Sequence, residues 1–461
     1  MRTKSLWVTM MAKKVTDKFP PEDVKDDFVP KEVYFDREFF ELEKERLWPY
    51  VWQIACREEE IPNVGDFVTY DICDDSIIVV RSKPNEIKAF HNVCPHRGNR
   101  LTEGCDHAKQ FLCTFHGWRF GLDGRNISVV DRKDWGDLLS DEDVRLKSVQ
   151  VGTWGGFVFI NMDPDCQPLD EFLIPVKELT AKHEFEKLRY AWYRSTIMPA
   201  NWKTVSEAFN EFYHVQQTHS QMMVYTNDYS ASKPMGRHGW ISYAVESGFP
   251  LGRSPRLPPK EVPLRELILE YAEQMKNDLD AMYSDRSYQA AQRIGKETTN
   301  ETPPDEVIAK LFQFTLEEAQ KAGSGWPEGM TAEYLAESGF DWHVFPNTIF
   351  LHPSIDAVLW YRFRPYNDDP EMCIFDIWSL ERFAPGTEPK LEREFYNDWR
   401  ECKWPLIYTQ DFANITRVQK GMKSRVFNGG RTSPIQERAI PNFHRSLRKF
   451  LRDPHEEDGQ I

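Results

Sequence analysis

The sequence lacks the features by which many nucleotide-using, membrane-spanning and nucleic-acid-binding proteins are recognised. Its 461 residues contain no G-x-G-x-x-G segment and no P-loop, so the usual fingerprints of nicotinamide, flavin and nucleotide sites are absent. No apolar run approaches the roughly 20 residues that a membrane helix needs. The net charge is −15, without a basic stripe or tail, which argues against a nucleic-acid partner or an anionic membrane as partner.

The sequence also shows no disulfide pattern and no convincing secretion signal. The apolar stretch within Met1–Ala12 is too short for a signal peptide, and two lysines follow it at once. A start at Met10 or Met11 stays open. We therefore expect a reducing, cytoplasmic location. Six of the eight cysteines show no pairing pattern, namely Cys56, Cys73, Cys105, Cys166, Cys373 and Cys402.

Two cysteines and two histidines stand in a C-x-H segment and a C-x-x-H segment, separated by sixteen residues. In a Rieske [2Fe–2S] cluster, Cys94 and Cys113 would hold one iron. The second iron would be held by His96 and His116, whose imidazoles make the cluster less negative and raise its reduction potential. Zinc is the alternative, but zinc fingers usually place both cysteines before both histidines. The pattern therefore favours the Rieske cluster.

A second pair of histidines, His214 and His219, lies a hundred residues downstream. On a regular helix these side chains would be about 140° apart, so they need a local distortion to converge on one metal. Two imidazoles and a carboxylate from elsewhere form the facial triad of non-haem Fe(II) oxygenases, which leaves positions open for O₂. The alternative is that both are surface histidines on a helix. The cluster motif upstream in the same chain argues against this alternative.

With both the cysteine–histidine motif and the downstream histidine pair, the chain resembles the large (alpha) subunit of Rieske non-haem iron aromatic-ring-hydroxylating oxygenases. The resemblance runs from about residue 40 to residue 450, and the blocks Cys94–Leu101, Cys113–Gly124 and Asn201–His219 carry it. In that family the third iron ligand is an aspartate shortly before a Gln-x-Gly-type segment. Asp411 precedes such a segment, Gln419–Gly421, so the resemblance implies that Asp411 is the third ligand.

The resemblance also implies a role for Glu211. Many members have an aspartate three residues before the first iron histidine, where this chain has glutamate, as some members acting on non-ring C–H bonds do. Glu211 is expected to accept a hydrogen bond from His214 and to reach His116 of a neighbouring subunit in a head-to-tail ring. The glutamate weakens the case for a simple hydrocarbon ring as substrate. We expect Tyr213 to pack behind the site and Glu207 to lie on a solvated helix face.

The expected fold class is α+β, in three parts. Residues 1–50 are predicted to be a helical lead-in that packs on the catalytic domain. Residues 51–162 are predicted to form an antiparallel β domain that carries the Rieske [2Fe–2S] loops. Residues 163–461 are predicted to form the catalytic mononuclear-iron domain, which the resemblance makes a helix-grip (START-like) fold with an antiparallel sheet. A helical insertion interrupts it at about residues 250–335.

Periodicity gives individual elements. The prolines of the insertion (250, 255, 258, 259 and 263) indicate a linker. An apolar stripe after them predicts one face of a helix. We interpret this face as part of the core, and the alternative is a lid over the pocket. The stripe comprises Leu264, Leu267, Ile268, Tyr271, Met275, Leu279 and Met282. The predicted helices are residues 36–48, 169–183 and 202–218, and the predicted strands are 67–70, 76–80, 87–90, 156–160, 348–352, 358–364 and 373–379.

The resemblance implies the terminal oxygenase component of a multicomponent system with a [2Fe–2S] cluster and one mononuclear Fe(II) per subunit. Because the chain lacks a flavin or nicotinamide fingerprint, electrons are expected from an NAD(P)H-dependent reductase, directly or through a ferredoxin. We favour ring dihydroxylation of a small apolar or aromatic substrate by a homotrimer, and the presence of a small beta subunit stays open. The alternatives are a monooxygenase that hydroxylates or oxidatively N- or O-dealkylates, and an electron carrier with a non-catalytic ligand-binding domain.

Overall fold

The computed structural model describes residues 16–243 and 251–455, so the expectations about Met1–Ala12 and Pro250 fall outside it. The chain forms two compact units. One unit comprises Glu43–Phe172, and the other comprises the chain up to Leu42 together with Leu173 onward. The sequence-based boundaries were 50/51 and 162/163, compared with 42/43 and 172/173 here. In the described part of the chain, no helix is both long and apolar enough to span a bilayer.

The unit Glu43–Phe172 is built on an antiparallel sheet, as predicted. Its central strands are short runs of β-branched and aromatic residues that are buried over most of their length. The sheet has the strand order β2 (Gln53–Arg57), β11 (Phe157–Asn161), β10 (Ser148–Trp154), β5 (Glu86–His91), β4 (Asp75–Lys83), β3 (Asp66–Ile72) and β6 (Cys105–His107).

A small second sheet in this unit supports the two loops that carry the predicted cluster ligands. It consists of β7 (Phe111–Leu112), β8 (Arg119–Phe120) and β9 (Asn126–Ser128), and the short helix α3 (Asp141–Val144) follows it. The two cysteines of the motif belong to the buried apolar cluster between these strands and the larger sheet. Rigid strands therefore hold the loops, which is the arrangement that metal ligands on loops require.

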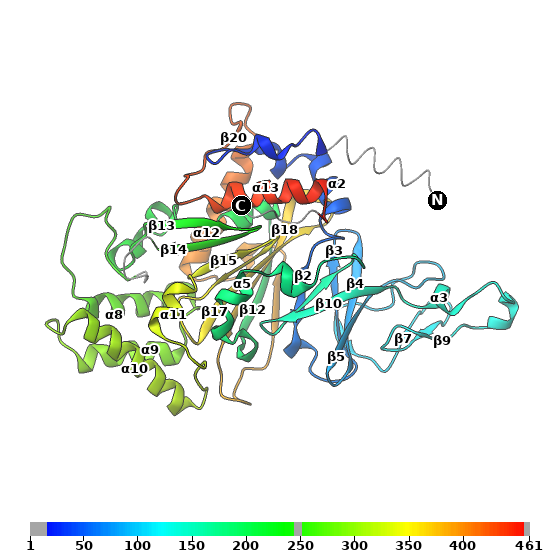
Figure 1. Cartoon of the computed structure of the whole chain (residues 1–461), viewed down its shortest axis with the longest axis horizontal. Coiled ribbons are helices and arrows are strands. Elements are labelled where there is room, and N and C mark those ends of the chain that lie inside the picture. Colours follow the sequence, from blue (N-terminus) through cyan, green and yellow to red (C-terminus); the bar gives the residue numbers. More distant parts are fainter. Residues whose placement is uncertain (1–15, 244–250, 456–461) are drawn as a thin grey trace. The chain divides into compact units, whose positions relative to one another are not determined.

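The other unit is built on an eight-stranded sheet (Figure 1). All neighbouring strands are antiparallel except the edge pair β12 and β19, which is parallel and was not predicted. A separate short pair, β1 (Val29–Pro30) and β20 (Gly429–Gly430), joins segments from both ends of the chain. The sheet has the order β13 (Ser230–Met235), β14 (His238–Tyr243), β15 (Asp341–Val344), β16 (Thr348–Leu351), β17 (Ala357–Tyr366), β18 (Asp369–Glu381), β12 (Arg189–Met198) and β19 (Arg393–Tyr396).

One face of this sheet carries a row of large aromatic side chains. Trp342 pairs with Phe350, which pairs with Trp360, which pairs with Trp378 on the next strand. All four are almost completely buried. Cross-strand neighbours of this kind contact each other on one face and stabilise the sheet by several tenths of a kcal/mol each, roughly up to 1 kcal/mol. Much of the tryptophan content therefore serves the core rather than a pocket.

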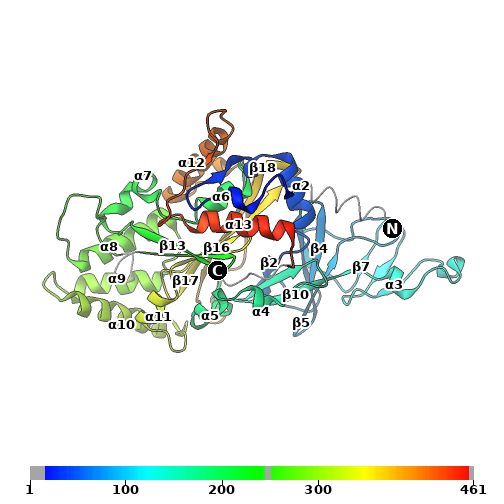
Figure 2. The same ribbon diagram turned by 45° about the horizontal axis from the view of Figure 1, so that its top comes forward.

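Helices cover the opposite face of the sheet, where the candidate site lies. The helices α6 (Trp202–Glu207), α12 (Leu406–Met422) and α13 (Ala439–Arg452) lie on this side of the sheet (Figure 2). The alternation of strand side chains between the two faces allows one strand to serve both the aromatic row and the site.

Two predicted helices are shorter than expected. The predicted helix 169–183 is broken into α4 (Leu169–Phe172), α5 (Val176–Leu179) and a final 3-10 turn, because Pro175 cannot continue a helix. The predicted helix 202–218 ends at Glu207 and resumes as α7 (Val215–Thr218). The predicted helix 36–48 is present as α2 (Arg37–Arg46).

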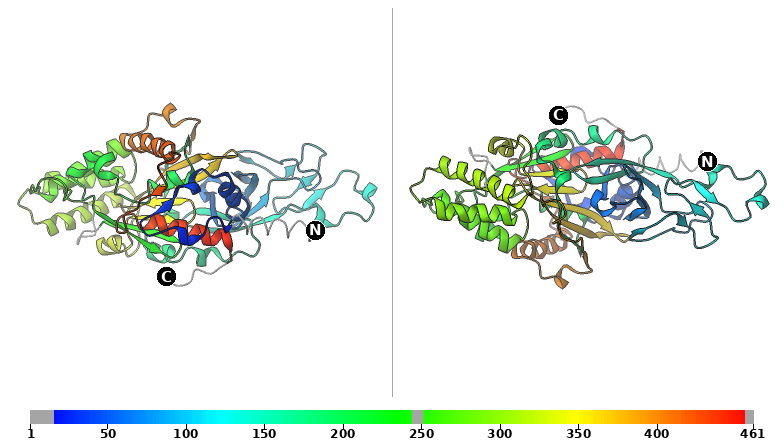
Figure 3. Two further views of the ribbon diagram at one scale, coloured as in Figure 1. Left: turned by 90° about the horizontal axis from the view of Figure 1, so that it is seen from above. Right: turned by 90° about the horizontal axis from the view of Figure 1, so that it is seen from below.

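The predicted helical insertion is present and forms a bundle of its own beside the sheet (Figure 3). The apolar stripe divides between two functions. Ile268 and its neighbours pack into the core of the bundle, whereas Met275, Leu279 and Met282 line a cavity at the candidate site. The bundle comprises α8 (Leu264–Gln274), a π-helical turn (Met275–Leu279), α9 (Asp285–Glu297), α10 (Pro304–Ala322) and α11 (Ala332–Glu337).

Candidate metal centres

The first candidate centre is built from two loops that share one backbone pattern. In the first loop, the Cys94 N–H donates to the Asn99 carbonyl oxygen at 2.8 Å, and the Gly98 N–H donates back to the Cys94 carbonyl oxygen at 2.9 Å. Gly98 has a φ of +78°, a conformation that only glycine adopts without strain. The loop therefore closes tightly on the cysteine.

The second loop repeats this pattern at the same spacing. The Cys113 N–H donates to the Trp118 carbonyl oxygen at 2.8 Å, and the Gly117 N–H donates to the Cys113 carbonyl oxygen at 2.9 Å. Gly117 has a φ of +74°. Both loops thus follow a C-x-x-x-G rule that accounts for the two glycines, and both direct a buried cysteine to the same place.

The side chains of the four predicted ligands come together between these loops. The imidazole centroids of His96 and His116 are 4.4 Å apart, and both Nδ1 atoms are buried with no hydrogen-bond partner within the described residues. The thiols of Cys94 and Cys113 interact directly, and burial raises the pKa of Cys94 to about 11. Burial, followed by the charges of its neighbours, lowers the pKa of His96 and keeps it neutral. Two thiols and two unpartnered nitrogens fit a Rieske [2Fe–2S] cluster.

Two tryptophans cover one side of this centre. The Trp118 ring stacks on His96 with centroids 4.8 Å apart, and Trp135 contacts the same imidazole edge-on at 5.7 Å. Trp118 is buried, whereas Trp135 is partly buried. The rings fix the orientation of His96 and keep water from that side, which are the means by which a protein tunes a cluster.

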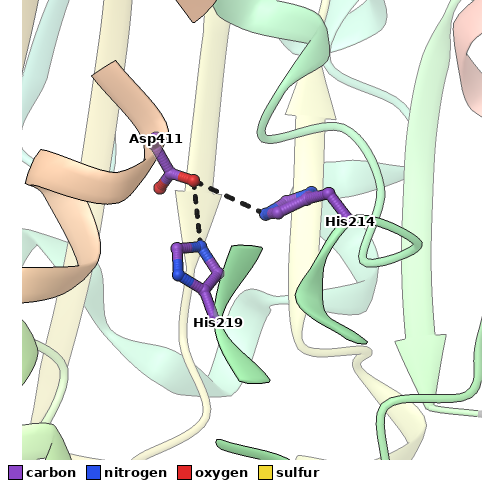
Figure 4. Close-up of side chains that lie close together, drawn as sticks. All are labelled: His214, His219 and Asp411. Atoms are coloured by element: carbon purple, nitrogen blue, oxygen red, sulfur yellow. Dashed lines mark ion pairs between the residues drawn. The ribbon is translucent and has the colours of Figure 1, made fainter. Parts of the chain in front are cut away.

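The second candidate centre is formed by His214, His219 and Asp411, whose ligand atoms all lie within 4.8 Å of one another. Asp411 Oδ1 lies 2.9 Å from His219 Nε2 and 3.7 Å from His214 Nε2 (Figure 4). Ligands about 2 Å from one metal and at right angles to each other are about 3 Å apart, so the geometry matches a facial triad. The donor set is the one that non-haem Fe(II) prefers.

Hydrogen bonds to the far ring nitrogens aim both imidazoles at the shared point. His214 Nδ1 lies 2.6 Å from Glu211 Oε1, and the His214 backbone N–H donates to Glu211 Oε2 at 3.0 Å. His219 Nδ1 lies 2.8 Å from the amide oxygen of Gln410. Each Nδ1 is therefore the donor, which leaves Nε2 with a lone pair for a metal. Burial opposes a charge on His214, but Glu211 and then Asp411 outweigh it and raise the pKa to about 9, so a metal that binds at Nε2 would displace a proton from it.

A break in the helix allows the side chains of His214 and His219, which would diverge on a regular helix, to point toward the same place. His214 immediately precedes the four-residue helix α7, and His219 immediately follows it with φ −118° and ψ 46°, outside the helical range. The Glu211 carboxylate accepts the His214 N–H that a continuous helix would have given to a carbonyl oxygen. Both side chains can therefore converge although they are five residues apart.

Helix α12 carries Asp411 and is anchored to the histidine segment at two points. Gln419, two turns after Asp411, accepts from the Asn201 N–H at 3.1 Å and from the Thr204 hydroxyl at 2.8 Å. The Asn414 amide donates to the Thr218 hydroxyl at 3.1 Å. These bonds fix the distance between the aspartate and the imidazoles before any metal binds.

Two cavities flank the triad. The first, of about 70 Å³, is largely apolar apart from the triad and Glu211, and none of the described residues that line it is a lysine or arginine. Its other lining residues are Ala208, Phe209, Phe212, Val215, Met222, Met275, Leu279, Met282, Leu351, Leu359, Tyr361 and Ile407. The second, of about 260 Å³, is richer in carboxylates, because Glu207, Glu211 and Glu437 line it. Burial, with these acidic neighbours, raises the pKa of Glu437 to about 7. His214 and Asp411 line both cavities.

Two expectations about neighbouring residues are wrong. Glu207 does not lie on a solvated face: its carboxylate accepts from the Tyr34 hydroxyl at 2.8 Å and lies 2.5 Å from Nε2 of the buried His444. Tyr213 is 44% exposed and does not pack behind the site. The sequence also gave no sign of Gln410, although its place directly before Asp411 could have suggested a supporting role.

Two family descriptions match the parts of the chain that carry the candidate centres. The family description "Ring hydroxylating alpha subunit (catalytic domain)" matches residues 181–453, more than half of the chain, and "Rieske [2Fe-2S] domain" matches residues 51–136. The carnitine monooxygenase oxygenase subunit of Escherichia coli (strain K12) is 36% identical over 194 residues, which are 41% of this chain and 52% of that protein. The glycine betaine monooxygenase oxygenase subunit of Chromohalobacter salexigens is 33% identical over 199 residues, 43% of this chain and 44% of that protein.

A third relative, the methanesulfonate monooxygenase hydroxylase subunit alpha of Methylosulfonomonas methylovora, is 32% identical over 262 residues, 51% of this chain and 63% of that protein. The chain spans about half the length of the first two relatives. Among solved structures, quaternary ammonium Rieske monooxygenase CntA with L-carnitine has a TM-score of 0.61 and 20% identity, covering 92% of this chain and 95% of that one. Naphthalene 1,2-dioxygenase from Rhodococcus with indole has a TM-score of 0.60 and 18% identity, covering 97% and 99%. At this identity both show the fold alone.

The separation of the two centres into different units generates a first prediction. Cys113→Ser should abolish the Rieske electron paramagnetic resonance signal and the acid-labile sulfide, while the mononuclear iron remains. Cys105→Ser, an exposed cysteine of the same unit, is the matched control and should leave both unchanged. Metal analysis that finds only zinc in the wild-type protein would refute the cluster.

The triad generates a second prediction. Asp411→Ala should keep the Rieske spectrum but lose most mononuclear iron and at least about 100-fold in turnover, because loss of a direct ligand exceeds the usual cost of losing a supporting residue. Asp305→Ala, an exposed aspartate of helix α10, should behave as wild type. Normal iron content in Asp411→Ala would mean that the third ligand lies elsewhere.

Proposed function

This chain belongs to the ring-hydroxylating alpha-subunit family, and from that membership we propose that it is the terminal oxygenase component of a multicomponent Rieske oxygenase. The triad beside an apolar cavity carries the proposal, since an electron carrier with a ligand-binding domain would need no open metal site. We propose Cys94, His96, Cys113 and His116 as the cluster ligands. For the mononuclear Fe(II) we propose His214, His219 and Asp411.

When bound, the cluster supplies electrons and the mononuclear iron activates O₂. The residues around the metal site orient its ligands and shape the cavity beside it. Glu211 and Gln410 hold the imidazoles of His214 and His219 in one tautomer. The apolar cavity walls exclude water and position a substrate carbon beside the triad. The reaction needs two electrons and two protons for each O₂, one oxygen atom entering the substrate and the other leaving as water.

We propose monooxygenation of an N-methyl group rather than the ring dihydroxylation favoured from the sequence. Two of the relatives are named as monooxygenases of quaternary ammonium compounds. The lining of the apolar cavity also admits a cation, because none of the described residues that line it is a lysine or arginine that would repel one. Tyr361 and the methionines add polarisable walls that suit a methylated ammonium group. The same lack of a lysine or arginine leaves no fixed side-chain charge to hold an anion such as the sulfonate named for the third relative.

The products follow from this chemistry. Hydroxylation of an N-methyl group gives an N-hydroxymethyl compound, which breaks at the carbon–nitrogen bond into formaldehyde and the demethylated amine. A quaternary ammonium substrate thereby becomes a tertiary amine and a proton is released. No further oxidant is needed beyond O₂ and the two electrons, which we propose come from an NAD(P)H-dependent reductase, directly or through a ferredoxin.

We further propose that Glu211 links subunits. Both of its oxygens already bind His214, and a second lone pair on each remains for another donor. A head-to-tail homotrimer would allow His116 of a neighbouring subunit to donate to it, so that each cluster serves the iron of another copy. Glu211 lines the larger, carboxylate-rich cavity, which supports an approach from that side.

The substrate class is tested by a product panel with a surrogate reductase. The panel comprises glycine betaine, choline and trimethylamine as N-methyl compounds, methanesulfonate as an anion, and naphthalene as a ring. We expect formaldehyde from one or more N-methyl compounds in proportion to O₂ consumed, and no cis-dihydrodiol. Dihydrodiol formation without formaldehyde would show that the ring-dihydroxylation alternative is correct.

The bridging role of Glu211 is tested by Glu211→Gln. The amide has nearly the same shape but lacks the charge that strengthens the bonds to two imidazole donors. We expect both metals to remain, while reoxidation of a pre-reduced cluster slows by about 10- to 100-fold, the usual cost of losing a residue that supports a metal ligand. Glu328→Gln, at an exposed position, is the control. Wild-type reoxidation in Glu211→Gln, or full activity in a strict monomer, would contradict the bridge.

A further inference from the structure

One acidic residue interrupts an apolar row on the helix-facing side of the large sheet. Ile241 pairs with Asp341 across strands β14 and β15, and Asp341 pairs with Leu351 on β16. Leu351 in turn pairs with Leu359 on β17. Directly opposed residues of an antiparallel sheet project on the same face. Because Leu351 and Leu359 line the apolar cavity, Asp341 lies next to the cavity wall.

The Asp341 carboxyl is buried, and one of its two oxygens has no hydrogen-bond partner among the described residues. The residue is 2% exposed, and its Oδ2 atom has no hydrogen-bond partner within the described residues. Burial alone raises the pKa of Asp341 well above its ordinary value. A buried polar group without a partner lowers stability, so its presence in an otherwise apolar row indicates a use other than folding.

A group of three tyrosine rings includes one that lies within electrostatic reach of this carboxyl. Tyr271 on α8 lies one turn before Met275, a residue of the cavity wall. Burial first, and then the Asp341 charge, raises the pKa of Tyr271, so the two side chains lie within electrostatic reach of each other. The Tyr271 ring packs edge-to-face on Tyr225 and Tyr283, with centroids 6.0 and 5.8 Å apart. Aromatic faces beside a carboxyl are the usual surroundings of a methylated ammonium group.

Tyr361 connects this corner to the candidate metal centre. It lines the apolar cavity, and its pKa is raised by burial first and then by its neighbours, among them Asp411 and Asp341. Both carboxyls therefore lie within electrostatic reach of the same ring. The two carboxylates that line the cavity, Glu211 and Asp411, thus lie at the metal centre, whereas the Asp341 carboxyl lies apart from them, next to the wall that Leu351 and Leu359 form.

We propose that Asp341, with the ring of Tyr271, forms the subsite that holds the cationic nitrogen of a small methylated ammonium substrate. The nitrogen would lie between Asp341 and the triad, with one methyl group directed toward Asp411. This inference rests on the proposed function, because it assigns how the same cavity selects its substrate. Asp341 keeps its proton in the empty cavity and releases it to solvent when the cation binds, so that the carboxylate and the ammonium neutralise each other.

The test compares a cation with its neutral isostere. Choline and 3,3-dimethylbutan-1-ol have the same shape and differ in the charge of the central atom. We expect calorimetric titration of the complete wild-type protein, with both metals, to show binding of choline at least about 10-fold tighter than that of the alcohol, the tenfold ratio being a modest value for a desolvated cation site. Titration in buffers of different ionisation enthalpy should show a proton released with choline and none with the alcohol.

Asp341→Asn should abolish both the preference and the proton release, while the affinity for the alcohol changes little. Leu351→Met, at the neighbouring position of the row, is the matched control and should shift both probes by the same factor. Because the carboxyl destabilises the fold, Asp341→Asn should also keep or raise the Tm, whereas a purely structural aspartate would lower it. Tyr271→Leu provides a second variant, which should weaken choline more than the alcohol.

The outcomes separate the two proposals. If the wild-type preference for choline persists in Asp341→Asn without loss of proton release, the Asp341 subsite is refuted and the proposed function stands. If the wild-type protein shows no preference but releases formaldehyde from an uncharged amine, the cationic subsite is likewise refuted. If neither probe binds and no N-methyl compound yields formaldehyde, the proposed substrate class fails together with the subsite.

Discussion

The structure depends on the convergence of three ligand side chains from two segments almost two hundred residues apart. His214 and His219 flank a single short turn, and Asp411 comes from a long helix on the same face of the sheet. Without a shared metal or proton, the lone pairs of the two ring nitrogens and the carboxylate oxygen repel one another, and the atoms also lose their hydration. The surrounding chain must therefore hold them together. The helix break, the Gln419 anchor and the bonds to Glu211 all serve that purpose.

The sequence was most informative where local chemistry fixes the structure. The spacing of the cysteines and histidines predicted a cluster site, and the loops have the closure that Gly98 and Gly117 require. The strands of both sheets were recognisable as short runs of β-branched and aromatic residues between turn residues, and most of these runs are buried on both faces. The positions of His214 and His219 were recognisable, but Asp411 required resemblance to a family, since nothing local distinguishes it from other acids.

The remainder could not be predicted because it depends on tertiary contacts. The start of the second helical segment at Val215 depends on the Glu211 side chain, which takes the His214 N–H from the backbone, and a helical pattern does not reveal this. The burial of Glu207 depends on His444, more than two hundred residues away. Asp341 became informative only when strand register placed it beside the cavity. Substrate preference was likewise invisible in composition, because most aromatic residues serve the core.

The walls of the cavity indicate the substrate class, since they are apolar outside the metal centre and no lysine or arginine is among the described residues that line them. The most direct test is a single turnover without a reductase. Protein with both metals reduced is mixed with O₂ and an N-methyl ammonium compound that the panel identifies. The account predicts about one formaldehyde per chain, because the cluster and the iron together hold the two electrons that one monooxygenation consumes. Reoxidation of the cluster without formaldehyde or any other oxygenated product would contradict it.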